Sequence, residues 1–131
     1  MLRSRWLIIQ AQPVTKKNSI SLHIIKDRTG RSRIIPSPSK QYKEYEREAL
    51  RQLPIDFQMI DYPVNVKAEF YMGTHRHVDL VNLQEALLDI LVKSQILKDD
   101  DSSIVESMDG SRVFYDKENP RTEVTITWEE A

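Results

Sequence analysis

The order of elements that this sequence predicts is typical of an α+β fold, with two helices packed on one mixed or antiparallel sheet. Apolar and polar residues alternate over short segments near both ends and in the middle of the chain, which is typical of half-buried strands. Two intervening segments instead carry apolar residues three and four positions apart, which is typical of amphipathic helices. We expect a single domain over residues 1–131, since this length supports a hydrophobic core.

The first elements are expected to be a strand and a β-hairpin. The strand covers the β-prone run Trp6–Ile9, and Pro13 ends it. Residues 20–26 and 31–36 alternate around a short polar turn that contains Gly30, which can take positive φ without a steric penalty. This pattern predicts a hairpin that carries several arginines.

A first helix is predicted between the hairpin and Pro54, which cannot continue it. Residues 37–39 supply a turn and a helix cap, and residues 39–53 carry apolar side chains at helical spacing. Tyr42 and Tyr45 lie about one turn apart on this helix. We expect the two rings to pack in the core rather than to stack on bases.

The second half of the chain is expected to contain a central strand, a second helix and three further strands. Val64–Phe70 alternates cleanly and ends before Gly73, as a central strand would. Leucines at spacings of three and four predict a helix that begins after Asp79. The remaining strands are expected over residues 104–108, 113–115 and 122–128.

Composition excludes several classes of protein. The chain contains no cysteine, so it has neither disulfides nor thiolate zinc sites. No apolar run approaches the roughly 20 residues that span a bilayer. We therefore expect a soluble, cytoplasmic protein with no membrane partner.

The charges divide unevenly along the chain. Residues 1–53 contain twelve Lys or Arg and four acidic residues, a net charge of +8, whereas residues 54–131 contain seven and sixteen, a net charge of −9. A phosphate-binding surface beside an acidic metal pocket would produce this division, and so would a charge-matched fold. The candidate nucleic-acid contacts are Lys16, Lys17, Arg28, Arg31, Arg33 and Arg76.

These cations also have simpler interpretations. Lys16 and Lys17 could form an ordinary basic turn, and cationic edge strands also prevent aggregation. His75 and His77 end the central strand, where phosphate contacts or surface positions are expected rather than a catalytic base. Sequence pattern alone leaves these alternatives open.

Carboxylates bracket the second helix. Asp79 precedes its first turn, Glu85 and Asp89 lie four residues apart on it, and Asp99–Asp101 follows after the chain has turned back. If these segments fold against each other, several carboxylates converge, which is what a hard cation such as Mg²⁺ or Mn²⁺ requires. Alternatively, Asp79 only caps the helix, and the others are solvated surface residues.

The same residues resemble a known family. Asp79–Leu83, a helix carrying Asp89, and then Asp99-Asp100 after a short loop are similar to the central motif of RusA-type Holliday junction resolvases, which are often encoded by prophages. Together with weaker matches elsewhere, the resemblance spans nearly the whole chain. These further matches are Pro13 with Lys16–Asn18, Pro38-Ser39 with Tyr42 and Tyr45, and Pro120-Arg121.

The resemblance implies a homodimer of α+β subunits that binds four-way DNA junctions and nicks two opposed strands with magnesium. By motif position, the metal-binding aspartates would be Asp79 and Asp100. The reaction would be hydrolysis of a phosphodiester, in which the cation polarises the phosphoryl oxygen and activates a water molecule. Lys16 and Lys17, with the hairpin arginines, would hold the DNA backbone by charge.

Two positions depart from the family motif. Val81 stands where a second aspartate is usual, and Glu85 stands where a lysine is usual. Either the protein binds junctions without cutting them, or the site is rebuilt with Glu85 and Asp89 as replacement ligands. We favour the rebuilt site, because one carboxylate is lost and another is gained close by. A third possibility is a protein-interaction module, which would have no junction affinity.

Overall fold

The computed structural model describes residues 1–16 and 20–131, and the α+β prediction is confirmed. Nine elements follow one another in these residues, and each expected strand and helix is present. In chain order they are β1 (Leu2–Ile9), β2 (Ile20–Lys26), β3 (Ser32–Pro38), α1 (Lys40–Gln52), β4 (Val64–Met72), α2 (Leu80–Lys93), β5 (Val105–Ser107), β6 (Arg112–Tyr115) and β7 (Arg121–Glu129).

The main sheet is mixed and is built around β4 and β7. Strand β7 pairs antiparallel with β1 on one side and with β4 on the other. Strands β5 and β6 both run parallel to β4 and share its remaining edge, with β5 beside its start and β6 beside its end. This register places Tyr115 opposite Met72, where β4 leads into the loop before α2.

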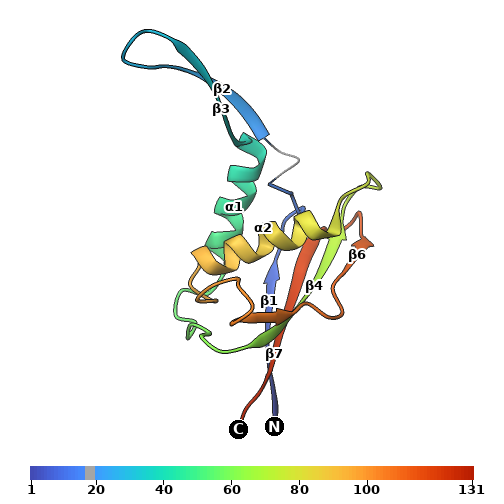
Figure 1. Cartoon of the computed structure of the whole chain (residues 1–131). Coiled ribbons are helices and arrows are strands. Elements are labelled where there is room, and N and C mark those ends of the chain that lie inside the picture. The colour runs from blue at the N-terminus through green and yellow to red at the C-terminus, as the bar shows by residue number, and fades with distance from the viewer. Residues whose placement is uncertain (17–19) are drawn as a thin grey trace.

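Both helices contribute to one core with the sheet. Strand β4 alternates buried and half-buried residues along its whole length, so one face of the sheet carries the apolar side chains. Helix α2 crosses the strands on that face (Figure 1) and buries leucines such as Leu83 and Leu87. Tyr42 and Tyr45 of α1 are buried as well, so the packing prediction for these rings is confirmed.

Strands β2 and β3 form a separate two-stranded sheet that projects from the body beyond α1 (Figure 1). At its turn, the Asp27 carboxylate accepts hydrogen bonds from the backbone N–H groups of Thr29 and Arg31 at 2.9 and 3.0 Å. Gly30 has φ +82°, as the turn pattern predicted. The hairpin therefore presents its cations to solvent, away from the core.

None of the helices in the described residues has the length and apolar character needed to cross a bilayer.

Candidate active site

Asp79 forms the N-cap of α2. Its backbone is extended, and its Oδ1 accepts hydrogen bonds from the backbone N–H groups of Val81 at 2.9 Å and Asn82 at 3.4 Å. The capping role considered from the sequence is therefore confirmed. Among the described residues, no donor contacts Oδ2, and the side chain is exposed. One oxygen thus fixes the orientation of the carboxylate while the other faces solvent.

The loop before Asp79 is held in place at Gly73. The Gly73 N–H donates to Oε1 of Gln12 at 2.7 Å. A Cβ at Gly73 would lie 2.7 Å from that oxygen and 2.8 Å from Cγ of Pro120. Glycine fits here because a Cβ would overlap the Gln12 side chain and the Pro120 ring, so one of them would have to shift.

A basic groove lies on one side of this loop. Its volume is about 570 Å³, and residues 12–15, 72–74 and 76–78 line it together with Gln41, Lys117 and Pro120. Arg76, His77 and Lys117 are exposed side chains of the lining, and no acidic residue contributes to it. The groove therefore favours an anion such as a phosphate, immediately beside the N-terminus of α2.

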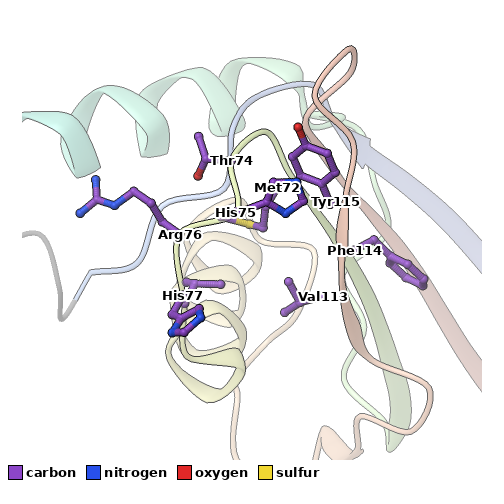
Figure 2. A pocket seen from close by; sticks show the side chains of 9 residues that line it. Met72, Thr74, His75, Arg76, His77, Val113, Phe114 and Tyr115 are labelled. Carbon is purple, nitrogen blue, oxygen red and sulfur yellow. The ribbon is translucent and has the colours of Figure 1, made fainter.

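A second cavity, of about 370 Å³, lies on the other side of the loop. The rings of His75 and Tyr115 stack there, with centroids 3.6 Å apart and planes at 27°. Figure 2 shows the two rings beside Met72, while Arg76 and Phe114 point away from them. The loop before α2 thus separates a basic groove from an aromatic cavity.

A different environment surrounds the C-terminal half of α2. The backbone N–H of Asp100 donates to Oδ1 of Asp99 at 2.7 Å. Desolvation raises the pKa of Asp100 above its ordinary value, and the Asp99 side chain and the charges of Asp99 and Asp89 add to the rise. The Asp89 carboxylate lies 3.6 Å from Nζ of Lys16. Three carboxylates therefore approach one another at this end.

The carboxylates expected to share one ion thus lie in two groups. Asp79 and Asp89 are ten residues apart, which corresponds to roughly 15 Å along a helix at about 1.5 Å per residue. The structure brings Asp89 and Asp100 together and places Asp79 at the other end of α2. In the described part of one chain, no group of three or more His, Cys, Asp or Glu residues could hold a metal ion.

The two departures from the family motif lie between these groups. Val81 is 59% exposed, so an apolar side chain faces solvent where the motif has a carboxylate. Glu85 is exposed and lies one turn before Asp89 on α2, as its spacing required. That Glu85 and Asp89 act as replacement ligands stays a prediction.

The expected DNA contacts have distinct environments. Arg28, Arg31 and Arg33 are exposed on the hairpin, and none of them makes an ion pair with another described residue. Lys16 is paired with Asp89, and Arg76 lines both cavities. Lys17 lies outside the described residues.

Two residues of this region were not assigned a site role from the sequence, since Lys117 was part of an expected turn and Tyr115 part of an expected strand. His75 was expected at the surface or in contact with a phosphate, and its pairing with a tyrosine ring was not predicted. Their grouping depends on the pairing of β6 with β4, which joins residues about forty positions apart. The sequence does place Tyr115 and Lys117 at or just after the end of a strand. It does not specify how that strand is aligned with β4, and this alignment brings the residues together.

Comparison with known proteins identifies the family. No curated protein matches the chain significantly. The family model described as endodeoxyribonuclease RusA matches residues 10–127, which include the hairpin, both helices and all of the aspartates discussed above. The chain therefore belongs to the RusA endodeoxyribonuclease family, whose members act on Holliday junctions.

Proposed function

We propose that this protein is a structure-selective endodeoxyribonuclease that hydrolyses phosphodiester bonds of four-way DNA junctions with a divalent cation, Mg²⁺ or Mn²⁺. One observation carries the proposal. A carboxylate oxygen of Asp79 faces solvent beside a groove that Arg76, His77 and Lys117 line without any acidic residue. A phosphate held in that groove lies next to an oriented carboxylate, as metal-assisted hydrolysis requires.

The chain's cations are arranged to hold two parts of a branched substrate. Arg76 and Lys117 contact a phosphate in the groove, next to the positive end of α2. Arg28, Arg31 and Arg33 lie on the projecting hairpin and reach a second arm of the junction (Figure 1). Binding of DNA to either surface releases counterions from the DNA. The affinity for the junction therefore falls as the salt concentration rises.

The cation site requires both groups of carboxylates. When bound, the cation supplies a Lewis acid that polarises the phosphoryl oxygen and lowers the pKa of a bound water. Within one protomer, Asp79 caps the N-terminus of α2, whereas the charge of Asp100 acts together with that of Asp89, ten residues further along the chain. We therefore propose a homodimer in which Asp79 of one copy meets Asp100 of the other. Two-fold symmetry then yields two sites, one for each opposed strand.

A second candidate function is junction binding without cleavage. Val81 offers no oxygen to a cation, and Glu85 offers no positive charge to a leaving oxygen. The Asp89 carboxylate is partly neutralised by Lys16 at 3.6 Å. These observations favour a protein that retains the DNA-binding surface and lacks the chemistry.

Titration of Mg²⁺ and then Mn²⁺ against a fluorescently labelled four-way junction separates the candidates. The nuclease produces paired nicks in opposed strands of the junction and leaves a linear duplex of the same arm sequence intact. Binding without nicks at every metal concentration contradicts the nuclease and supports the silent junction-binding protein. Absence of junction binding at low salt contradicts both and favours a protein-interaction module.

A further inference from the structure

The stacked rings of His75 and Tyr115 form the one described aromatic pair that lines a cavity next to the proposed cleavage site. His75 belongs to the loop before α2, and Tyr115 is the last residue of β6. Tyr115 is 46% exposed, although its neighbour Phe114 packs against Tyr71 on the other face of the sheet. An exposed tyrosine at the mouth of a cavity leaves a π face available to a planar ligand.

The cavity suits a planar ligand with polar edges. Its volume of about 370 Å³ falls within the range of roughly 300–1,000 Å³ that is typical of small-molecule sites. Met72 and Val113 supply apolar surface, and Thr74 supplies a hydroxyl (Figure 2). An exposed aromatic ring beside apolar surface, with an arginine close by, is the kind of lining that binds a nucleobase outside a helix.

The cavity and the basic groove share one wall. Thr74, Arg76, His77 and Val78 line both of them. A strand whose phosphate lies in the groove can therefore place a neighbouring base in the cavity by crossing this loop. At the branch point of a four-way junction each exchanging strand passes from one helix to the next, so moving a base there out of its stack costs less than inside a continuous duplex.

We propose that His75 and Tyr115 form a stacking platform for one unstacked base next to the phosphodiester that is cleaved. This inference rests on the proposed function, since it assigns the base to the strand held in the groove. The platform favours substrates with an unstacked nucleotide at the groove, and stacking tolerates any base because every base has a π face. The competing explanation is structural: the ring pair only fixes the loop on β6.

Fluorescence of 2-aminopurine placed beside the branch point tests the platform. Measurements in EDTA keep the DNA intact, so they do not depend on cleavage. Stacking on a ring quenches 2-aminopurine, so its emission should be higher in the complex with the Tyr115→Ala variant than in the wild-type complex. The same variant and His75→Ala should bind the junction on the order of tenfold more weakly.

Conservative and control variants separate stacking from loss of structure. Tyr115→Phe keeps the ring and should behave as the wild type, whereas Tyr115→Leu fills similar space without a π face and should lose the quenching. Tyr62→Ala removes an exposed tyrosine from another ring pair, with Trp128, and should change neither readout. The salt dependence of binding should be unchanged in the ring variants, because base stacking releases no counterions.

Each outcome bears on one proposal. Equal quenching in the wild-type, Tyr115→Ala and Tyr115→Leu complexes overturns the platform and shows that the ring pair is structural. Cleavage of junctions whose 2-aminopurine emission is insensitive to the ring variants leaves the nuclease intact and refutes the platform. Ring-dependent quenching without cleavage at any metal concentration supports the platform and refutes the nuclease.

Discussion

The two ends of helix α2 carry the same kind of charged group in opposite environments. At the N-terminal end, Asp79 is hydrogen-bonded to the helix, and the groove beside it is lined by Arg76 and Lys117. At the other end, Asp99 and Asp89 lie near Asp100 and contribute to its raised pKa. The cations beside Asp79 attract a phosphate, whereas carboxylates that crowd one another favour a bound cation.

The helix dipole strengthens this difference. The N-terminus of α2 carries partial positive charge and attracts phosphate, and the basic groove lies beside it. Among the described residues, the groove at the N-terminal end is lined by cations without a carboxylate, whereas the carboxylates near Asp100 have Lys16 beside Asp89. The difference between the two ends is the reason for the homodimer proposed above, in which one end from each copy contributes to the same site.

The largest expected effect comes from the carboxylate at the N-terminal end. Asp79→Asn should lower junction cleavage by at least 10²–10³-fold, roughly the loss that follows removal of one transition-state contact in other enzymes. Asparagine is also a good N-cap, so the fold and junction binding should be retained. Cleavage rate and junction affinity measured together check this. Full cleavage by the variant would mean that Asp79 is only a cap.

Gly73→Ala should destabilise the protein by about 1–3 kcal/mol, because the added Cβ overlaps Gln12 and Pro120 at 2.7 and 2.8 Å. Unfolding in urea measures the change. Gly30→Ala is the matched control, since its Cβ has no neighbour within 4 Å and only the φ of +82° opposes it. That variant should lose about 1 kcal/mol. Equal losses of stability in the two variants would show that the loop before α2 shifts to accommodate the added Cβ without further cost.

Arg76→Ala should weaken junction binding and reduce the slope of log affinity against log salt by about one, as expected for a phosphate contact. Binding isotherms at several salt concentrations provide the slope. Arg47→Ala, an exposed arginine of α1 outside both cavities, should leave it unchanged. An unaltered slope in the Arg76 variant would remove the groove from the DNA-binding surface.

The smallest effect concerns Asp100 and pH. Its pKa is raised in the folded chain, so the folded state binds a proton more readily than the unfolded state, and stability falls as pH rises through and above the ordinary value of 3.8. Asp100→Asn should therefore stabilise the protein at neutral pH, by less than about 1 kcal/mol since the group is exposed. The gain should vanish at a pH below that ordinary value.

Asp116 provides the control of opposite sign. The hydrogen bond from Arg121 lowers the pKa of Asp116 below 3.8, so its contribution is present above that value and is lost as pH falls. Asp116→Asn should therefore destabilise the protein at neutral pH. Thermal unfolding of both variants across a range of pH measures these two changes in stability. Two changes in the same direction at neutral pH would contradict the opposite pKa shifts of Asp100 and Asp116.

Much of the fold was predictable because its signals are local. The turn that needs Gly30, the cap at Ser39 and the cap at Asp79 are each decided by a few neighbouring residues, and all three are present. Strand β1 is longer than expected because it pairs with β7 along its whole length. The length of such a pairing cannot be predicted from the residues of one strand alone.

The candidate site was predictable only in part. The separation of Asp79 from Asp89 follows from the rise of the helix that they share. The approach of Asp100 to Asp89 instead depends on how the chain reverses after α2, where Gln95 has φ +65°. The contact of His75 with Tyr115 depends on the register of β6 against β4, which alternation does not specify.

The most direct test of the two-ended site mixes two inactive variants, Asp79→Asn and Asp100→Asn, and measures nicking of a labelled four-way junction with Mg²⁺. If the ends of α2 from two copies form one site, each mixed dimer holds one site with both aspartates and one site with neither. Nicking should then return on mixing, with one strand cut in each junction. No nicking at any ratio of the two variants would contradict a site shared between copies.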